Sequence, residues 1–298
     1  MSLGEFRDLL ERHARPDMTT AIDGVRVCRT DPSTPPEASM SGMVLAVIAQ
    51  GGKRLALGDR VYDYGVGQYL VASADLPVTG HVAPGRSVLG LGMTLEPAVI
   101  AELLLQAGPG ALPRSTDTAR PGIAVSDASE DLLDAIVRLL RLLDRAADRR
   151  ALAPLIKREI LWRLMTGEQG DAVRQLGLED SSLNHITRAV RWIRGNYAEA
   201  FRVEDLAQLS GMSVSAFHRN FQAVTAMSPI QFQKQIRLQV ARLLLANRPQ
   251  DVTGVGHRVG YDSPSQFSRD YKRQFGLPPS VDAVRLRDRA DHEAAAVL

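Results

Sequence analysis

The sequence predicts an α+β protein with a β-rich front part flanked by helices and an all-helical last third. Three observations lead to this prediction. Short apolar runs separated by glycine turns occupy residues 43–72, apolar residues follow helical spacing from 96 to 165, and a motif repeats at an offset of 50 residues in the last third. A chain of 298 residues is long enough for two separate cores.

The sequence signals for strands lie between about residue 40 and residue 95. Apolar runs at 43–49, 55–57, 61–64 and 69–72 are the expected strands. Turns are expected at Gly51–Gly52, Gly58–Asp59, Gly65–Gly67 and Pro84–Gly85. Short strands at such close spacing favour a small sandwich or barrel.

Helical signals begin at the N-terminus (1–13) and return after the strands, at 96–107, 129–146 and 153–165. Asp127 and Ser129 are both candidate N-caps for the third of these helices. A loop is expected at 108–128 and a polar linker at 166–182. The apolar faces of 129–146 and 153–165 are wider than packing on one sheet requires, which predicts a homodimer interface.

Charge differs between the two parts of the chain. Residues 1–183 hold 20 basic and 24 acidic side chains, whereas residues 184–288 hold 15 basic and 8 acidic ones. A basic segment of this kind fits a polyanionic partner. No run of eighteen apolar residues occurs, so we expect no membrane span and a cytoplasmic protein. A single cysteine, Cys28, excludes a disulfide framework and the multi-cysteine zinc site of DNA-repair methyltransferases.

The internal repeat carries the strongest functional signal. Its two copies read Ser213-x-Ser215-x-Phe217-x-Arg219-x-Phe221 and Ser263-x-Ser265-x-Phe267-x-Arg269-x-Tyr271. Each copy follows a glycine that can end a preceding helix in the left-handed conformation, and each begins with a serine that can cap the next helix. Aromatic residues four apart then face inward. The spacing predicts two helix-turn-helix units.

The outward faces of the two second helices are the candidate DNA-binding sites. Their residues, caps included, are Ser213, Ser215, His218, Arg219 and Gln222 in the first unit, and Ser263, Ser265, Ser268, Arg269 and Lys272 in the second. Arginine can bond a guanine edge bidentately, serine serves several bases, and lysine meets phosphate. The alternative is that Arg219 and Arg269 are solvated or form ion pairs within the chain. Two copies in register on a basic segment favour DNA.

The second copy, from Val252-Thr-Gly-Val-Gly-His-Arg-Val-Gly260 through Tyr261 to the closing Gly276 and Pro279, resembles the signature of the AraC/XylS regulators. The resemblance covers about 100 C-terminal residues. It implies two recognition helices joined by a long helix at about 228–247 and set in adjacent major-groove segments. Ser215, His218, Arg219, Ser265, Ser268 and Arg269 would then read bases. Pro264 and Ser215 depart from the larger side chains that members often carry there.

The front part resembles the N-terminal domain of one AraC-type subfamily. The resemblance rests on Gln50-Gly-Gly-Lys53, Leu57-Gly58, Tyr62-Asp-Tyr64, Gly67-Gln-Tyr69-Leu-Val and Asp75-Leu-Pro77-Val-Thr. It implies a cupin-like β fold and favours a role in sensing an effector. Candidate residues for the wall of an effector pocket are Val47, Tyr62, Tyr64, Leu70 and His81. The same aromatic and aliphatic residues would also suit a packed core, and His81 would suit the surface.

These signals divide the chain into a sensing and dimerisation domain (1–170), a linker (171–183), a DNA-binding domain (184–288) and a tail (289–298). We expect a homodimeric transcription regulator, not an enzyme, that binds promoter DNA and responds to a small organic effector. Only His13 and His81 lie in the front part, so we expect no metal, catalytic residue or cofactor. Two alternatives remain: a cupin-type enzyme tethered to DNA, and an architectural DNA binder without effector. Whether the front part binds a metabolite distinguishes the architectural DNA binder from the effector-responsive regulator.

Overall fold

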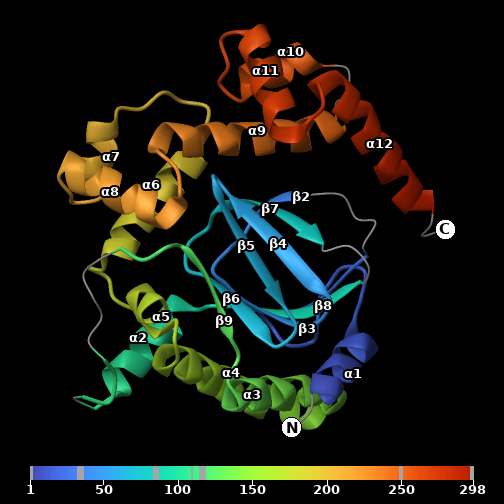
Figure 1. The fold of residues 1–298 in the computed structure, drawn as a ribbon, viewed down its shortest axis with the longest axis vertical. Coiled ribbons are helices and arrows are strands. Elements are labelled where there is room, and N and C mark those ends of the chain that lie inside the picture. The colour runs from blue at the N-terminus through green and yellow to red at the C-terminus, as the bar shows by residue number, and fades with distance from the viewer. Residues whose placement is uncertain are drawn as a thin grey trace.

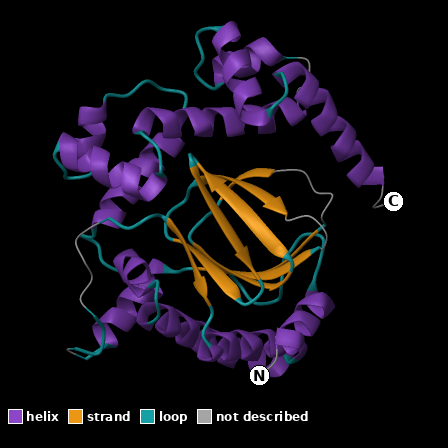
Figure 2. Ribbon diagram, in the orientation of Figure 1, coloured by secondary structure: helices purple, strands orange, loops and turns teal. Residues whose placement is uncertain are grey.

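The structure is a computed structural model that describes residues 3–31, 37–82, 87–108, 110–113, 119–247 and 251–295. The predicted α+β class is confirmed. All described strands fall within the first 127 residues, and every described element after them is helical (Figures 1 and 2).

Two antiparallel sheets face one another and form a sandwich. The first contains, in spatial order, β1 (Val25–Thr30), β8 (Val88–Thr94), β3 (Val44–Gln50), β6 (Gln68–Ala72) and β9 (Ile123–Asp127). The second contains β2 (Glu37–Met40), β7 (Pro77–Val82), β4 (Gly52–Leu57) and β5 (Arg60–Gly65). Figure 1 shows helices below the five-stranded sheet and the C-terminal helices above the four-stranded one.

Strand register decides which side chains face the helices and which face the opposite sheet. Val47 of β3 pairs with Tyr69 of β6 and with Leu91 of β8, so these three side chains share one face. The Tyr69 hydroxyl lies 3.9 Å from the position of a Cβ built on Gly167, just beyond the end of α4 (Ala146–Thr166). That face therefore packs on the helices. Leu70, the next residue along β6, faces the interior of the sandwich.

The helix layer beneath the five-stranded sheet consists of α1 (Leu3–His13), α3 (Glu130–Arg141), a short 3₁₀ turn (Leu142–Asp144) and α4. Ser129 is the N-cap of α3, and its hydroxyl accepts a hydrogen bond from the Leu132 amide at 3.2 Å. The apolar residues of α3 are buried within the chain; these are Leu132, Ala135, Ile136, Val137, Leu139 and Leu140. Packing inside the protomer therefore accounts for the width of the apolar face of α3, which is not by itself a sign of dimerisation.

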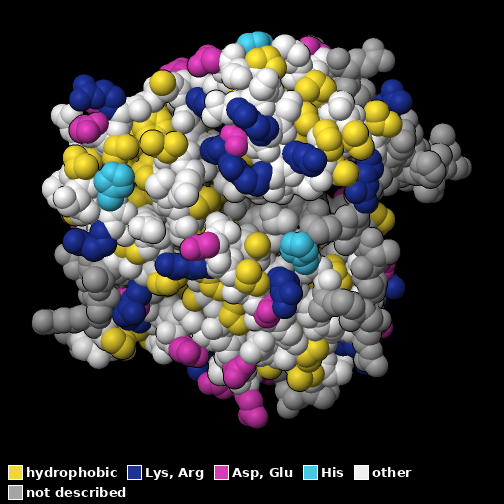
Figure 3. Space-filling view, turned by 45° about the horizontal axis from the view of Figure 1, so that its top comes forward, with side chains coloured by type: hydrophobic (Ala, Val, Ile, Leu, Met, Phe, Trp, Pro, Cys, Tyr) yellow, Lys and Arg dark blue, Asp and Glu magenta, His cyan; other side chains and the backbone are white. Residues whose placement is uncertain are grey.

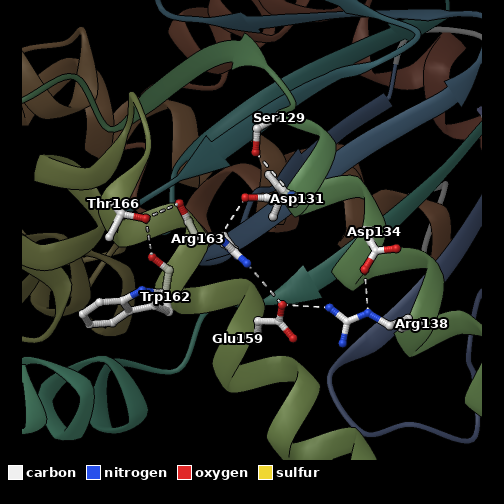
Figure 4. A network of polar contacts seen from close by, with 9 residues as sticks. Ser129, Asp131, Asp134, Arg138, Glu159, Trp162, Arg163 and Thr166 are labelled. Atoms are coloured by element: carbon white, nitrogen blue, oxygen red, sulfur yellow. Dashed lines mark hydrogen bonds and ion pairs between the residues drawn. The ribbon is translucent and has the colours of Figure 1, made fainter. Parts of the chain in front are cut away.

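Ion pairs join the polar edges of α3 and α4 (Figure 4). Arg138 bonds Asp134 and Glu159, both at 2.7 Å, and Arg163 bonds Asp131 at 2.8 Å. These side chains are partly exposed, so each pair is worth about 0–1 kcal/mol. These ion pairs therefore contribute little to stability and serve mainly to align the two helices.

The C-terminal part is entirely helical. Its elements are α6 (Ser182–Gly195), α7 (Val203–Leu209), α8 (Val214–Thr225), α9 (Pro229–Asn247), α10 (Val252–Arg258), α11 (Pro264–Phe275) and α12 (Pro279–Ala295). The long helix expected at about 228–247 is α9. Figure 1 shows α6 to α8 at one end of α9 and α10 to α12 at its other end.

Several segments differ from the sequence-based expectation. The loop expected at 108–128 contains β9, and α4 begins at Ala146 and continues through Pro154. The stretch expected to be a linker contains α5 (Gly170–Leu176), whose Val173 and Leu176 are buried. The helix α2 (Pro97–Gln106) agrees with the expected helix at 96–107. Most of the expected tail belongs to α12, and the expected turn at Pro84–Gly85 lies outside the described residues.

The hydrophobic core is continuous from the sandwich into the first half of the helical part. One cluster extends from the strands to Phe217 of α8 and Phe232 of α9, whereas the second half of α9 and the helices after it share a smaller cluster around Phe267. The backbone amide of Gly122 also donates to the carbonyl of Val224 at the end of α8, at 2.9 Å. The first helical unit is thus fixed to the sandwich, and the division at residues 171–183 stays a prediction.

Ala226, which ends α8, predicts a stabilising substitution. Its φ of 58° lies in the left-handed region, where Gly276 ends α11 at the equivalent position with φ of 78°. A left-handed alanine costs about 1–2 kcal/mol, and glycine removes that strain while adding about 0.4–1 kcal/mol of entropy to the unfolded chain. We expect Ala226→Gly to raise the free energy of unfolding by about 0.5–1 kcal/mol in denaturant titrations. A loss of stability would show that the strain is relieved elsewhere.

Candidate nucleic-acid interface

Helices α8 and α11 begin in the same way. The Ser213 hydroxyl accepts from the Ala216 amide and the Ser263 hydroxyl accepts from the Gln266 amide, each at 3.3 Å. These bonds satisfy amides that the first turn leaves unpaired. The preceding turns contain Gly211 with φ of 64° and Gly260 with φ of 90°. The two serines therefore serve as caps, which fixes where each recognition helix begins.

Aromatic side chains hold both helices against the helical bundles. Phe217 and Phe221 of α8, and Phe267 and Tyr271 of α11, are completely buried. Ring centroids lie 5.4 Å apart in the first pair and 5.6 Å apart in the second. Because these residues are four apart, they fix the rotation of each helix about its axis. The opposite face of each helix is consequently directed to solvent.

The structure places the predicted contact residues on these outer faces. Ser215, His218, Arg219 and Gln222 are exposed on α8, as are Ser265, Arg269 and Lys272 on α11, while Ser268 is half-buried. Pro264 stands at the first position of α11, where proline is compatible with a helix start. Their exposure permits contact with DNA, and that contact stays a prediction.

The basic side chains on the two faces are free to bind an anion. Among the described residues, Arg219, Arg269 and Lys272 form no ion pair, in contrast to Arg273, which bonds Asp270 at 2.8 Å. This result argues against the alternative that both arginines pair within the chain. In Figure 3, Lys and Arg side chains gather over the helical part at the top of the face shown, and acidic side chains are more frequent toward the bottom.

A buried carboxylate that sequence reasoning missed organises the second unit. Asp282 of α12 is 1% exposed and accepts hydrogen bonds from the Tyr271 hydroxyl at 2.8 Å and from Arg242 of α9 at 2.9 Å. Burial, reinforced by the charge of Asp282, raises the pKa of Tyr271, so the phenol stays a donor. The three helices α9, α11 and α12 meet at this carboxylate.

Arg237 of α9 connects the two helical units. Its Nε donates to the carbonyl of Tyr197 at 2.7 Å and its Nη2 to the carbonyl of Ala198 at 3.2 Å, both in the loop after α6. Its Nη1 donates to the carbonyl of Gly260, in the turn of the second unit, at 2.8 Å. Partial burial lowers the pKa of Arg237. One guanidinium therefore binds backbone carbonyls of both units, which we call the Arg237 clamp.

Gly260 allows the two units to approach this closely. A Cβ at this position would lie 2.4 Å from the Ala198 carbonyl oxygen and 2.9 Å from the Arg237 guanidinium carbon. The positive φ also disfavours any other residue. The clamp and the glycine together set the orientation of α11 relative to α8.

Removing the clamp is expected to reduce DNA binding through geometry. Arg237→Ala leaves carbonyls of both units without their donor, at a cost of about 1–3 kcal/mol. Binding to DNA that carries both recognition elements should weaken, whereas binding to DNA with the first element alone should be unchanged. Arg202→Ala, which removes a 78% exposed arginine of the first unit, is the control. Equal weakening on both DNAs would contradict the positioning role.

The five residues proposed for an effector pocket do not converge. Tyr62 and Tyr64 share a face of β5, and burial and the nearby Cys28 thiol raise the pKa of Tyr64, which places this face toward the opposite sheet. Leu70 faces the same interior. Val47 packs toward the helices instead, and His81 pairs with Arg54 on the outer face of its sheet. Three of the five thus lie between the sheets.

No helix in the described part of the chain combines the length and apolar character that a membrane crossing requires.

Two family models match the chain. Residues 21–172 match the AraC-type transcriptional regulator N-terminus, and residues 206–283 match a helix-turn-helix domain.

Curated relatives match about half of the chain. The transcriptional activator RhaS of Salmonella paratyphi B is 26% identical over 153 residues, which cover 51% of this chain and 54% of RhaS. The thermoregulatory protein LcrF of Yersinia pestis is 27% identical over 171 residues, 56% of this chain and 61% of LcrF. The matches thus span between half and two thirds of the relatives' length.

Solved structures of ToxT from Vibrio cholerae share the fold. An apo ToxT variant superposes with a TM-score of 0.54 at 10% identity, over 90% of this chain and all of ToxT. ToxT bound to an unsaturated fatty acid gives a TM-score of 0.53 at 10% identity, over 87% and 94% of the two chains.

Proposed function

Since this chain belongs to the AraC-type transcriptional regulators, we propose that it binds promoter DNA sequence-specifically through α8 and α11. The observation that carries the proposal is the equivalence of the two recognition faces. Each presents an exposed arginine, Arg219 or Arg269, that has no ion-pair partner among the described residues, on a helix whose rotation is fixed by buried aromatics. An arginine so placed can bond a guanine edge bidentately.

The other residues of the two recognition faces differ in the part of the DNA that they contact. Ser215, His218, Ser265 and Ser268 lie near the arginines and contact neighbouring base edges. Gln222 and Lys272 lie one turn further along their helices, where Lys272 meets phosphate and Gln222 meets phosphate or an outer base. Phosphate contacts position the protein, and base contacts give specificity.

Selection from random double-stranded DNA with the intact chain tests the proposal. We expect the selected sequences to share two short elements whose centres lie about one helical turn apart, ~10 base pairs. Selection with a variant that carries both Arg219→Ala and Arg269→Ala provides the control. Failure to enrich any shared sequence, or enrichment of the same elements by the variant, would contradict it.

We also propose that the front part of the chain binds a small organic effector without a metal. Tyr62, Tyr64 and Leu70 supply an apolar interior between the sheets, and in fold the chain is similar to ToxT, one structure of which holds an unsaturated fatty acid. A ligand at about 100 times its dissociation constant stabilises a protein by ~2.7 kcal/mol. A melting-temperature screen of metabolites on the intact chain detects such a shift. A stoichiometric bound zinc or iron would favour the enzyme alternative.

We further propose that the protein forms a homodimer through the outward face of α4. Leu152 and Leu155 on this face are 42% and 61% exposed, unlike the buried leucines of α3. A symmetric pair of such helices would cover them. In the structure Leu140, which the width of the apolar face made a candidate for this interface, lies inside the protomer.

Leu155→Glu is expected to convert the dimer to a monomer. It places a charge at the centre of the proposed interface, where burial without a partner costs several kcal/mol. Sedimentation of the intact chain at about 10 µM measures whether the protein is a dimer or a monomer. An interface of standard size should hold the wild type together as a dimer. Leu105→Glu on α2, where the leucine is 88% exposed and off this face, should leave the dimer intact. A monomeric wild type would contradict the proposal.

A further inference from the structure

An open groove of about 670 Å³ lies outside the sandwich, between α4, the beginning of α2 and the segment before β1. Apolar side chains form its floor; these are Ile22, Val99, Ala153 and Leu161. Ile22, Ala153 and Leu161 are buried, and Val99 is half-buried. A concave apolar floor of this volume is typical of sites for small organic molecules.

Charged side chains surround the apolar floor, and basic ones predominate. Four basic residues and two acidic residues line the groove. Lys157 bonds Glu96 at 2.5 Å and the Asp23 carbonyl at 3.2 Å, and it thereby joins α4 to the other two walls. Arg158 bonds Glu102 of α2 at 2.6 Å. These pairs hold the walls in place and neutralise Glu96.

The other two basic residues of the groove have no partner. Arg149 and Arg150 form neither an ion pair nor a side-chain hydrogen bond within the described residues. Asp23, the remaining acidic residue, has an exposed side chain. The first turn of α4, which carries no side-chain cap and contains Asp148, also lines the groove at Ala146. With four basic and two acidic residues in its lining, the groove therefore has a net positive charge.

We propose that this groove binds an amphipathic organic anion, with an apolar body on the floor and a carboxylate between Arg149 and Arg150. Guanidinium groups match carboxylate oxygens in a planar, bidentate geometry. The inference rests on the proposed role of the front part as a sensor, and it adds a binding site beside α4 that is separate from the interior between the sheets. The groove face of α4 is separate from the Leu155 face proposed for dimerisation.

Octanoate and octan-1-ol are suitable probes, because they share an apolar body and differ in charge. Calorimetric titration of the intact chain should show octanoate binding that weakens with salt, since the contact is ionic. The double variant Arg149→Ala/Arg150→Ala should bind octanoate at least about tenfold more weakly. It should bind octan-1-ol as the wild type does. Arg149 is half-buried and Arg150 is exposed, and neither has a partner among the described residues, so the variant should fold.

The control variant is Arg26→Ala/Arg29→Ala, which removes two exposed arginines of β1 and should leave octanoate binding unchanged. Equal octanoate affinity in the wild type and in the Arg149 and Arg150 variant would overturn the proposal, as would the absence of octanoate binding by the wild type. DNA binding without octanoate should be the same in both proteins. A wild type that binds DNA normally but does not bind octanoate refutes this site alone, whereas failure of the wild type to bind DNA refutes the proposed function.

Discussion

Phe267→Ala is expected to lower the free energy of unfolding of the second helical unit by about 3–5 kcal/mol. Phe267 is completely buried, and its ring centroid lies 5.3 Å from that of Tyr261 and 5.6 Å from that of Tyr271. The unit around it has a small core separate from that of the sandwich. A cavity at its centre should therefore unfold α11 while the sandwich and α8 remain folded.

Denaturant titration followed by circular dichroism measures this effect, and the variant should show an early transition that the wild type lacks. Ser265→Ala, which removes an exposed hydroxyl of the same helix, should change stability by no more than about 0.5 kcal/mol. A loss below about 1 kcal/mol for Phe267→Ala would show that the unit does not depend on this ring.

Arg219→Ala and Arg269→Ala are each expected to weaken specific DNA binding by about 1–3 kcal/mol, with little effect on stability. Each loses the bidentate contact with one guanine, so each should relax specificity at a different position of the site. Because the two arginines lie on different helices, the losses of binding free energy in the two variants should be additive within about 0.5 kcal/mol.

Binding assays against a panel of single-base operator variants measure both affinity and the position of relaxed specificity. Lys272→Ala is the matched control, because loss of a phosphate contact should weaken all sequences about equally. If both arginine variants bound the selected site as tightly as the wild type, the recognition faces would be assigned wrongly.

The helical repeat could be predicted from the sequence because its determinants are local. Ser213 and Ser263 cap helices, and Phe217 and Phe221 define the inner face of α8 by their spacing alone. The long helix between the two units followed from the family resemblance. None of these features needs information about the remainder of the chain.

The strands were harder to predict because some of their signals depend on the partner strand. Gly90 and Gly92 of β8 interrupt the apolar pattern of a strand, yet a Cβ on Gly90 would lie 2.7 Å from the Val47 carbonyl oxygen of β3. Glycine is needed there by close approach and not by a turn. Alternation correctly placed Tyr62 and Tyr64 on one face, but it could not relate that face to Val47 on another strand.

The Arg237 clamp and the groove beside α4 also lay beyond sequence reasoning. Arg237 acts on carbonyls more than twenty residues away on both sides, and Arg149 and Arg150 read as ordinary surface arginines. The role of Asp282, in contrast, could have been predicted from the sequence. An acidic residue on the inner face of a helix requires a buried partner.

We propose that α8 and α11, held by the clamp, read two adjacent major-groove segments on one face of DNA. The most direct test is to insert about five base pairs, half a helical turn, between the two elements of the selected site. We expect the affinity to fall to that of a site with one element, and an insertion in the flanking DNA to have no effect. Unchanged affinity after the half-turn insertion would contradict the claim.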